Sequence, residues 1–384
     1  MADNNENKVL NVPHLRFPEF SGEWKKHSLG EIGETIIGLT YKPSDVVDNN
    51  GIIVFRSSNI KNGMIDYSDL VRVNKHIKDK IITKENDILV CARNGSQRLI
   101  GKNAIIKQED ANNTFGAFMM VYRANDNPFI LPLLSTKKYF SQVGENLGAR
   151  INQITTSDFN GFEFYFPENH AERTKIAELF RLLDERIATQ NKIIEDLKKL
   201  KSAITDLLFH SIADAHTIRL GEIAHITNGA GDVQDANTEH QEDWYPFFDR
   251  SEELKWFPTY SFDKEAVIYA GEGQSFYPRY YNGKFALHQR CYAITDFASC
   301  IIPKYCYHFM NTLNSYFVRN SVGSTVPSLR MDIFQKVEIR LPPIPKQQHI
   351  CKIIDAFYTK LEVEQRGISI LQELKQFLLS QMFI

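Results

Sequence analysis

"FRLLDERIATQNKIIEDLKKLKSAITDLL", residues 180–208, carries a regular stripe of side chains at alternating spacings of three and four residues. Such spacing is the a/d pattern of a coiled coil, so it predicts a long helix that buries one face against a partner helix. The stripe consists of Phe180, Leu183, Ile187, Gln190, Ile194, Leu197, Lys201, Ile204 and Leu208. Around it, the helical pattern from 172 to 209 would extend roughly 57 Å at 1.5 Å per residue.

The same stripe returns 174 residues later, near the end of the chain. Its members are Ile354, Phe357, Leu361, Glu364, Ile368, Leu371, Lys375, Leu378 and Met382. Every apolar layer recurs, and both polar interruptions recur with it. We therefore predict that the two helices pack on each other in antiparallel orientation, although each could instead pack only on its own globular part.

Polar side chains inside a coiled-coil seam fix its register at some cost in stability. Pseudo-twofold symmetry about the layers of Ile194 and Ile368 would bring Gln190 toward Leu371 and Lys375. The same symmetry would bring Lys201 toward Leu361 and Glu364, and these pairings are the register that we predict.

Each helix closes a longer repeat. The tetrapeptide LGEI occurs at 29–32 and again at 220–223, where it looks like the opening of a short strand, and Gly38 and Gly229 follow the two copies at equal distance. "GFEFYFPENH" at 161–170 is answered by "KVEIRLPPIP" at 336–345. Two related, diverged modules follow, because internal repetition on this scale reflects a repeated structural unit.

The expected fold is α/β (α+β), with two bodies of short-stranded sheets separated by the long antiparallel helix pair. The predicted strands lie at 52–60, 87–95, 117–123, 266–273 and 285–295, which are rich in β-branched and aromatic residues. The predicted domains are a first body at 1–166, a first helix at 167–213, a second body at 214–341 and a second helix at 342–384.

Composition bounds the class of protein. A chain of 384 residues with 43% hydrophobic content can bury sizeable cores. It lacks an apolar run of the roughly 18 residues that a membrane span needs, and its N-terminus is too polar for a signal peptide, so we expect a soluble, cytoplasmic protein. The five cysteines form no C-x-x-C pair, which predicts reduced thiols and no metal site.

The charge distribution matters more than the formal net charge of −2. Eight Lys and Arg between 72 and 102 face three acidic residues, the same excess recurs between 279 and 340, and 232–272 is acidic. Because phosphate binding depends on where positive charge is displayed, the two basic segments are candidate nucleic-acid surfaces. Solvated loops are the alternative, and the acidic segment should face solvent or a partner.

In the first body, the loop "ARNGSQRLIGK" at 92–102 follows a predicted strand. Its spacing does not fit a phosphate-binding P-loop, because five residues separate its glycines and Asn103 stands where Ser or Thr is required. Its polar side chains suit contacts to base edges and phosphates, although a solvated turn is the alternative. The candidate DNA-binding residues of this body are Arg56, Asn59, Lys78, Lys80, Arg93, Asn94, Ser96, Gln97, Arg98, Lys102 and Arg150.

In the second body, "GEGQSFYPRYYNGKFALHQR" at 271–290 interleaves basic and aromatic residues. This mixture suits contacts to phosphates and bases, although tyrosines in a sheet more often pack against neighbouring strands. The candidates here are Arg250, Arg279, Tyr280, Tyr281, Lys284, Gln289, Arg290 and Arg330.

Catalytic motifs are missing from the sequence. "DNPF" at 126–129 lacks the second proline of the adenine-methyltransferase motif and has no glycine-rich cofactor loop with it. The patterns G-x-S-x-G and H-E-x-x-H do not occur, nor does a convincing nuclease carboxylate cluster. We therefore predict a binding protein without a catalytic residue of its own.

These features together resemble the specificity subunit of type I restriction-modification enzymes, along nearly the whole chain. The resemblance is carried by the doubled LGEI and by "VPHLRFPEFSGEW" (12–24), "AERTKIAELFRLLDERI" (171–187), "KQQHICKIIDAFYTKLE" (346–362) and "YNGKFALHQRCYAI" (281–294). It implies two target-recognition domains, each reading one half of a split DNA site, with the helix pair acting as a ruler. It also implies partners: modification subunits, two by analogy, that use S-adenosylmethionine to methylate adenine, and restriction subunits that use ATP and Mg.

The second helix departs from the first where Gln347 and Gln348 stand for Arg173 and Thr174, and where Tyr358 replaces Asp184. These changes argue against equal docking at the two ends. Two alternatives remain: a stand-alone DNA-binding regulator on a duplicated scaffold, which should bind DNA tightly alone, and a divergent methyltransferase or nuclease, which should bind S-adenosylmethionine.

Overall fold

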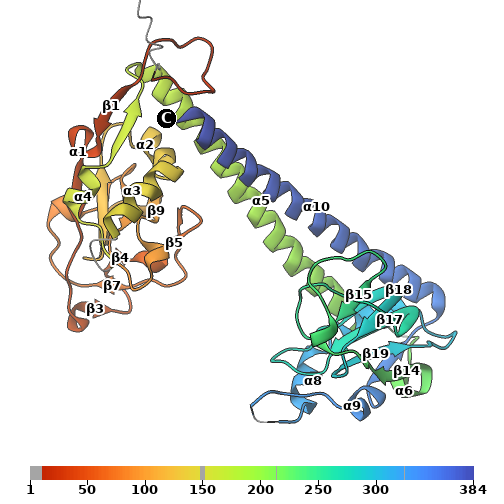
Figure 1. Cartoon of the computed structure of the whole chain (residues 1–384). Helices are drawn as coiled ribbons and strands as arrows, with labels where there is room; N and C mark the ends of the chain where they lie inside the picture. Colours follow the sequence, from red (N-terminus) through yellow and green to blue (C-terminus); the bar gives the residue numbers. More distant parts are fainter. Residues whose placement is uncertain (1–10, 148–151, 213, 324) are drawn as a thin grey trace, which may run out of the picture. The chain divides into compact units, whose positions relative to one another are not determined.

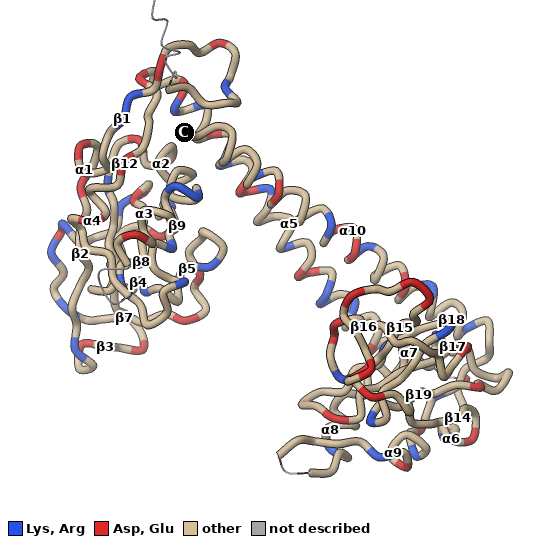
Figure 2. Tube along the Cα trace, viewed as in Figure 1, with Lys and Arg blue, Asp and Glu red and all other residues tan. Residues whose placement is uncertain are grey.

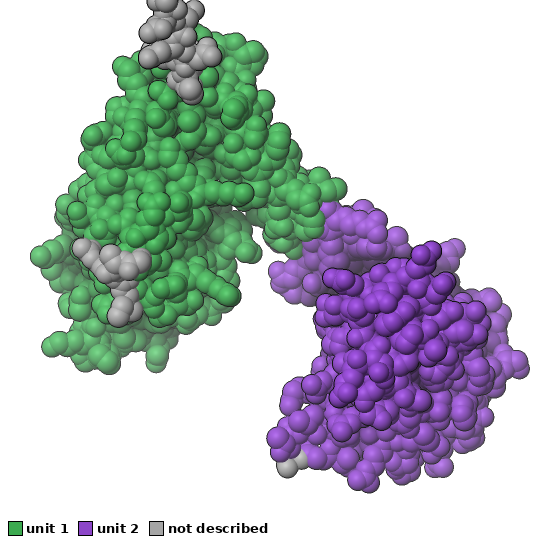
Figure 3. Space-filling model, in the orientation of Figure 1, with its two compact units in different colours: residues 1–191, 367–384 green, residues 192–366 purple. Residues whose placement is uncertain are grey.

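The computed structural model describes residues 11–147, 152–212, 214–323 and 325–384. The chain divides into two compact units, of which the first is built from two stretches of sequence and the second from one (Figures 1 and 3). Unit 1 comprises Met1–Asn191 and Gly367–Ile384, and unit 2 comprises Lys192–Arg366. Each unit therefore contains a globular body together with part of both long helices, whereas the four segments expected from the sequence divide the chain between body and helix.

The body of unit 1 is a set of short strands with small helices. Its main sheet has the order β2-β11-β8-β9, and a second sheet has the order β10-β4-β7-β3. The strands are β1 (Lys25–Ser28), β2 (Glu34–Ile37), β3 (Val46–Val47), β4 (Ile52–Phe55), β5 (Ile60–Lys61), β6 (Met64–Ile65), β7 (Arg72–Val73), β8 (Ile88–Cys91), β9 (Asn103–Ile105), β10 (Thr114–Phe115), β11 (Met119–Arg123) and β12 (Glu163–Phe166). The helices are α1 (Leu29–Ile32), α2 (Asn127–Leu133), α3 (Lys137–Leu147) and α4 (Thr156–Asn160).

The body of unit 2 repeats this plan with longer strands. Its sheet has the order β14-β19-β17-β18-β15-β16, in which β14-β19-β17 corresponds to β2-β11-β8 of unit 1. The strands are β13 (His216–Arg219), β14 (His225–Asn228), β15 (Tyr245–Phe248), β16 (Lys255–Phe257), β17 (Phe262–Ala270), β18 (Arg279–Leu287), β19 (Cys291–Thr295) and β20 (Glu338–Leu341). The helices are α6 (Leu220–Ile223), α7 (Pro303–Met310), α8 (Asn314–Asn320) and α9 (Met331–Gln335). The single strand predicted at 285–295 is wrong, because a turn at 288–290 separates β18 from β19.

Both copies of LGEI are single helical turns, α1 and α6, so the expectation that they open a strand is wrong. In unit 1 the side chain of Glu31 accepts a hydrogen bond from the Ser28 backbone at 3.2 Å, which caps the turn. Each turn is preceded by a strand, β1 or β13, that pairs antiparallel with the strand before the long helix, β12 or β20. The two repeated motifs are therefore hydrogen-bonded neighbours, which explains why they recur together.

The repeated glycines Gly38 and Gly229 mark a close approach of two backbone segments. A Cβ atom at Gly38 would lie 2.3 Å from the carbonyl oxygen of Gly116, and one at Gly229 would lie 2.1 Å from that of Leu287. No side chain fits at either position, so both modules require glycine there.

The two long helices are α5 (His170–His210) and α10 (Ile344–Met382). Asn169 accepts a hydrogen bond from Ala171 N at 2.9 Å and so caps the start of α5. The side chains predicted to form the seam between the ends of the stripe are buried or half-buried: Leu183, Ile187, Gln190, Ile194, Leu197, Lys201, Ile204, Phe357, Leu361, Glu364, Ile368, Leu371, Lys375 and Leu378. The helices run side by side (Figure 1), antiparallel where Asp184 meets Lys375 and Gln190 lies beside Gly367.

The lysines of the seam have partners one or two turns away from the predicted ones. Lys375 forms an ion pair with Asp184 in unit 1, and Lys201 Nζ lies 4.1 Å from the ring centroid of Tyr358 in unit 2. Asp184 and Tyr358 occupy the same position in the two copies. In both units, therefore, the residue at this position contacts the seam lysine of the other helix. The predicted register is corrected accordingly, because Lys375 meets Asp184 and Lys201 meets Tyr358 in place of Gln190 and Glu364.

The residue at the end of each long helix, or directly after it, completes the core of a body. Phe383, which directly follows α10, is 8% exposed and packs on Trp24, Phe129 and Phe180 of unit 1. Phe209, at the end of α5, is 3% exposed and packs on Tyr305 and Phe309 of unit 2. Each of these phenylalanines follows the last seam position of its helix.

Within the described residues, none of the helices is both long and apolar enough to cross a membrane.

Candidate nucleic-acid interface

At one end of the sheet of unit 1, three loop segments are joined by backbone hydrogen bonds. The N–H groups of Ala92 and Arg93 both donate to the carbonyl of Phe118 at 3.0 Å, and Ile154 N donates to Ala92 O at 2.9 Å. A bridge between Arg93 and Gln153 completes the arrangement. The predicted loop at 92–102 is thereby held against 116–118 and 152–154.

Unit 2 builds the same arrangement from different residues. Gly271 N donates to Arg290 O at 3.0 Å, and Leu329 N donates to Gly271 O at 2.7 Å. A bridge joins Glu272 to Ser328, as Arg93 is joined to Gln153 in unit 1. By backbone position, Glu272 corresponds to Arg93 and Arg290 corresponds to Phe118.

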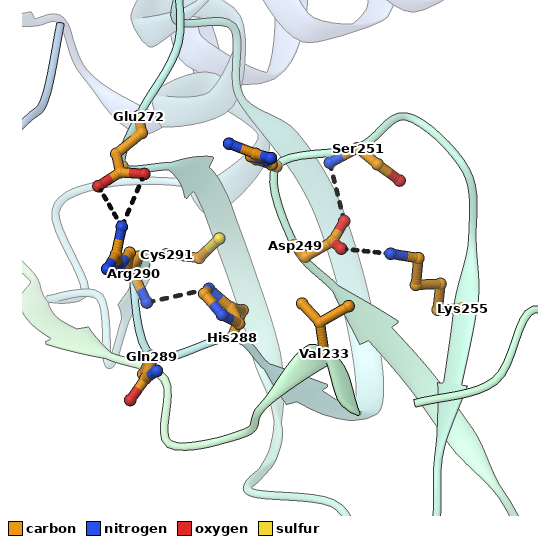
Figure 4. A pocket seen from close by; sticks show the side chains of 11 residues that line it. Val233, Asp249, Ser251, Lys255, Glu272, His288, Gln289, Arg290 and Cys291 are labelled. Atoms are coloured by element: carbon orange, nitrogen blue, oxygen red, sulfur yellow. Dashed lines mark hydrogen bonds and ion pairs between the residues drawn. The ribbon is translucent and has the colours of Figure 1, made fainter. Parts of the chain in front are cut away.

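The side chains at these equivalent positions make contacts of different chemistry. In unit 1 the guanidinium carbon of Arg93 lies 5.1 Å from the ring centroid of Phe118, which is 59% exposed. In unit 2, Nη1 of Arg290 donates to both carboxylate oxygens of Glu272, at 2.9 and 3.2 Å (Figure 4). Each unit thus has one exposed guanidinium beside the side chain at the equivalent position, but Arg93 follows β8, whereas Arg290 precedes β19, the strand that corresponds to β11.

The ion pair of unit 2 lies at the edge of a pocket of about 510 Å³. The pocket is lined by Val233, Asp249, Arg250, Ser251, Lys255, Gly271, Glu272, His288, Gln289, Arg290 and Cys291 (Figure 4). His288 Nδ1 accepts a hydrogen bond from the Arg290 backbone at 3.2 Å, which fixes the turn that carries Gln289. The side chains of Arg250 and Gln289 have no hydrogen-bond or ion-pair partner among the described residues, so they can contact a ligand in the pocket.

Asp249 is the buried acid of this pocket, with 5% of the residue exposed. Burial opposes its ionisation, but hydrogen bonds from Lys255 Nζ at 2.6 Å and Ser251 N at 2.8 Å hold the pKa of Asp249 below its ordinary value. The charge of the Asp249 carboxylate is therefore balanced by Lys255, and Arg250 is left without a carboxylate partner among the described residues.

The acidic segment at 232–272 does not lie wholly apart from the candidate site. Figure 2 shows acidic residues in the loops beside β15 and β16, and two acids of the segment, Asp249 and Glu272, line the pocket itself. Both are paired with a cation, Lys255 or Arg290. Ion pairing lets these two residues lie among basic side chains, although the segment is acidic as a whole.

The other candidates of unit 1 have mixed positions. Ser96, Gln97 and Arg98 are exposed on the loop after β8, and Lys102 is half-buried at its end. Asn94 is committed to the loop, since its amide donates to Ser57 Oγ and accepts from Ser96 N, both at 2.9 Å.

Two further groups of unit 1 candidates lie elsewhere. Asn59 is fully buried and bonds to the backbone of Arg56, Asp66 and Asp69, so it is corrected from a surface contact to a structural turn residue. Arg56 forms an ion pair with Asp69 at 2.8 Å.

Lys78 and Lys80 are exposed around the 3-10 turn η3 (Asp79–Ile81). Lys80 pairs with Glu34 at 3.1 Å, at the end of the sheet opposite to Arg93. The structure therefore does not bring these lysines together with the loop after β8. Arg150 lies outside the described residues.

Among the candidates of unit 2, the tyrosines have structural surroundings. Tyr280 donates to Glu265 and packs near Tyr307 of α7, while Tyr281 packs on Phe248 and Phe285. Their predicted role in binding is corrected to packing, which is the common role of tyrosine in a sheet.

The basic candidates of unit 2 outside the pocket are partly engaged. Arg279 donates to the carbonyl of Ser251, and Lys284 Nζ lies 4.7 Å from the ring centroid of Tyr260. Arg330 is exposed at the start of α9, directly after the segment that pairs with Gly271 and Glu272.

Sequence reasoning did not name Phe118 and Glu272 as members of the site. Each lies next to a named candidate only through strand pairing, and neither residue type indicates DNA binding by itself. Aligning the two modules by their backbone hydrogen bonds is the signal that finds them.

Metal chemistry has no visible support in the described part of the chain, where no group of three or more His, Cys, Asp and Glu side chains could hold a metal ion.

Comparison with known proteins identifies the family. The sequence model of the type I restriction modification DNA specificity domain matches twice, at residues 21–199 and 213–376. The chain is 31% identical over 165 residues to the type I restriction enzyme EcoDI specificity subunit of Escherichia coli, an alignment that covers 43% of this chain and 36% of that protein. It is 28% identical over 193 residues to the EcoKI specificity subunit of Escherichia coli strain K12, covering 47% and 41%. These alignments span less than half the length of either relative.

Solved structures agree at the level of the fold. The type I restriction-modification S subunit from M. genitalium matches with a TM-score of 0.65 and 18% identity over 97% of this chain and 99% of that one. A structure described as underlying complex assembly and conformational transition of the type I R-M system matches with a TM-score of 0.55 and 16% identity over 96% and 99%. The two domain matches together cover most of the chain. The chain therefore belongs to the type I restriction modification DNA specificity family.

Proposed function

We propose that this chain is the DNA-recognition subunit of a type I restriction-modification assembly and reads a bipartite target. Each body would read one half-site with the loops at the end of its sheet, and the chain would direct partner enzymes without performing catalysis. The observation that carries this proposal is the repeated loop arrangement around Arg93 and Glu272, because one backbone frame that displays different side chains suits two different half-sites.

The chemistry of the displayed side chains supports DNA as the ligand. Arg reads guanine through two hydrogen bonds, and Gln can read adenine in the same way. Gln97 and Arg98 are exposed in unit 1, and Arg250, Gln289 and Arg290 are exposed in unit 2. Each body therefore presents both kinds of base-reading side chain.

The long helices suit the role of a spacer between half-sites. α5 has 41 residues and α10 has 39, which corresponds to about 60 Å of helix at 1.5 Å per residue. A split site requires a spacing set by protein geometry, as in dimeric DNA-binding proteins. Two helices packed along one seam form a stiffer spacer than either helix alone.

The outer faces of the same helices support a role in partner binding. Away from the seam, Leu182 and Ile370 in unit 1 are 51% and 64% exposed, and Leu207 in unit 2 is 61% exposed. Contiguous exposed apolar surface marks protein interfaces, and both helices expose further apolar side chains, such as Leu200 on α5 and Phe377 on α10. We propose that modification subunits, two in number, cover these faces, and that restriction subunits join through the complex.

The cofactors of such an assembly would be held by the partners. S-adenosylmethionine would serve the modification subunits, and ATP with Mg would serve the restriction subunits. We propose no cofactor site in this chain.

The test is methylome sequencing of cells that express this chain with its candidate modification subunit, beside cells that express that subunit alone. A split motif with a methylated adenine in each half, found only when this chain is present, is the expected result. If the two proteins assemble but no such motif appears, the proposal fails. Tight sequence-specific DNA binding by the chain alone would then favour the regulator, and binding of S-adenosylmethionine by the isolated chain would favour the divergent methyltransferase.

A further inference from the structure

Resting on this proposed function, we infer that the equivalent pairs Arg93/Phe118 and Glu272/Arg290 are specificity-determining elements. In each body one guanidinium would read a guanine, and Phe118 or Glu272 would be the positioning residue that holds it.

The geometry of Arg290 leaves the right donors available. Its Nη1 is engaged by both oxygens of Glu272, at 2.9 and 3.2 Å, whereas its Nη2 and Nε have no partner among the described residues. The Arg290 side chain is 66% exposed and that of Glu272 is 24% exposed. The less exposed Glu272 therefore contacts the guanidinium from the protein, and the rest of the guanidinium faces outward. Two parallel N–H groups on one edge match the O6 and N7 acceptors of guanine.

Arg93 also keeps its N–H donors available, but its neighbour is an aromatic ring and not a carboxylate. The guanidinium carbon of Arg93 lies 5.1 Å from the Phe118 centroid, within reach of a cation–π contact, and the Arg93 side chain has no hydrogen bond or ion pair among the described residues, so its N–H donors are available. Phe118 is 59% exposed, so this contact also lies at the surface. A held guanidinium loses less rotamer freedom on binding than a free one, which favours a defined base over a diffuse contact.

The side chain beside each arginine, Glu272 or Phe118, gives the two bodies different net charges at this position. Glu272 cancels the charge of Arg290, so this pair gains little from a phosphate and is better suited to a neutral base edge. Phe118 leaves the charge of Arg93 intact, so this arginine is also attracted to the backbone phosphates. Unit 1 should accordingly contribute more salt-dependent affinity at this position, and unit 2 should contribute more discrimination.

The experiment compares the methylated motif of the full chain, expressed with its modification subunit, for wild type, Glu272→Gln, Phe118→Leu and Glu239→Gln. Glu239 is an exposed acid of the same acidic segment and does not line the pocket, so its substitution controls for the loss of one negative charge. Glu272→Gln should weaken the preference for guanine at one position of one half-site by about tenfold, as expected for a disturbed bidentate contact. Phe118→Leu should relax one position of the other half-site, and Glu239→Gln should leave the motif unchanged.

Salt-dependent binding supplies a second readout with the purified chain and its modification subunit. Glu272→Gln should bind a duplex of unrelated sequence more tightly than wild type at low salt, because it exposes the charge of Arg290. Arg290→Lys keeps a cation but loses the planar edge, and it should relax the same base position as Glu272→Gln.

The outcomes separate the inference from the function on which it rests. If wild type yields a split motif but Glu272→Gln and Phe118→Leu both leave it unchanged, the inference is overturned and the proposed function stands. The inference is also overturned if both variants alter the same half-site, or if Glu239→Gln alters the motif as Glu272→Gln does. If wild type yields no split motif in an assembled complex, both are overturned.

Discussion

The starts of the two long helices are tied to their bodies at the same place by different chemistry. In unit 1, Arg173 Nη1 donates to the carbonyl of Pro167 at 2.6 Å, and Arg173 forms an ion pair with Asp126, just before α2. In unit 2, Gln347 donates to the carbonyl of Pro342 at 2.8 Å and accepts from Ile302 N at 2.9 Å, just before α7. The duplicated scaffold preserves the contact and not the charge.

The departures of the second helix from the first are explained by what each side chain contacts. By sequence alone, Gln347 in place of Arg173 argues for unequal docking of the two ends. Both side chains nevertheless bind the proline that precedes their long helix and the residue just before a short helix of the same body, α2 or α7. Tyr358 in place of Asp184 follows the same rule, since each neighbours a seam lysine. A substitution that looks radical in sequence is conservative when its neighbours have changed with it.

The largest expected effect comes from the two phenylalanines that complete the cores. Phe383→Ala should destabilise unit 1 by about 3–5 kcal/mol, because it leaves a cavity among Trp24, Phe129 and Phe180. The matched variant Phe209→Ala should destabilise unit 2. Hydrogen exchange of β11 and β19 amides measures the two units separately, and equal loss of protection in both strands for either variant would break the comparison.

A smaller effect is expected where the helix starts meet their bodies. Gln347→Ala should cost about 1–3 kcal/mol, since the buried carbonyl of Pro342 and the part-buried N–H of Ile302 and carbonyl of Cys300 lose their partner. Gln347→Arg tests the comparison directly. If position 347 has come to depend on a neutral amide, arginine there should not restore stability, because unit 2 supplies a backbone N–H where unit 1 supplies Asp126. Denaturant unfolding of wild type and the two variants measures this, and full stability of Gln347→Arg would contradict it.

The two bodies should also differ in their response to acid through Asp249. Its pKa is lowered in the folded state, so the stability it contributes is present above the pKa of the unfolded chain and is lost as pH falls through the folded value. Between about pH 5 and pH 3, unfolding free energy should therefore fall more steeply for wild type than for Asp249→Asn. Parallel curves for the two proteins in denaturant titrations would show that the Asp249–Lys255 pair does not contribute this dependence.

The smallest effect is expected from the seam lysines. Lys375→Ala should cost up to about 1 kcal/mol, because an ion pair that solvent still reaches, here through the 40% exposed side chain of Asp184, contributes little. Lys201→Ala should cost a similar amount, about 1 kcal/mol for a cation over the half-buried ring of Tyr358. Salt separates them: 1 M NaCl should reduce the effect of Lys375→Ala, which removes an ion pair with Asp184, more than that of Lys201→Ala.

The candidate site was predictable only in part from sequence. The loop after β8 and the segment 271–290 were found because basic, amide and glycine residues follow strand-like runs. Phe118 and Glu272 were missed, and Asn59, Tyr280 and Tyr281 were assigned to binding although they serve turns and packing. Residue type alone does not say which face of a short strand is exposed, and in these bodies that depends on pairing between distant segments.

The sequence by itself determined the helix pair and the duplication. A heptad stripe predicts which face of a helix is buried and indicates that a partner helix covers it, because its 3-4 spacing matches the helical repeat over many turns. The tertiary structure alone decided that LGEI is a helical turn, that Phe209 and Phe383 complete the cores, and that Arg93 meets Phe118 while Glu272 meets Arg290. Four residues carry too little periodicity to select a structure, and contacts across long sequence separations depend on how strands pair, which no local pattern encodes.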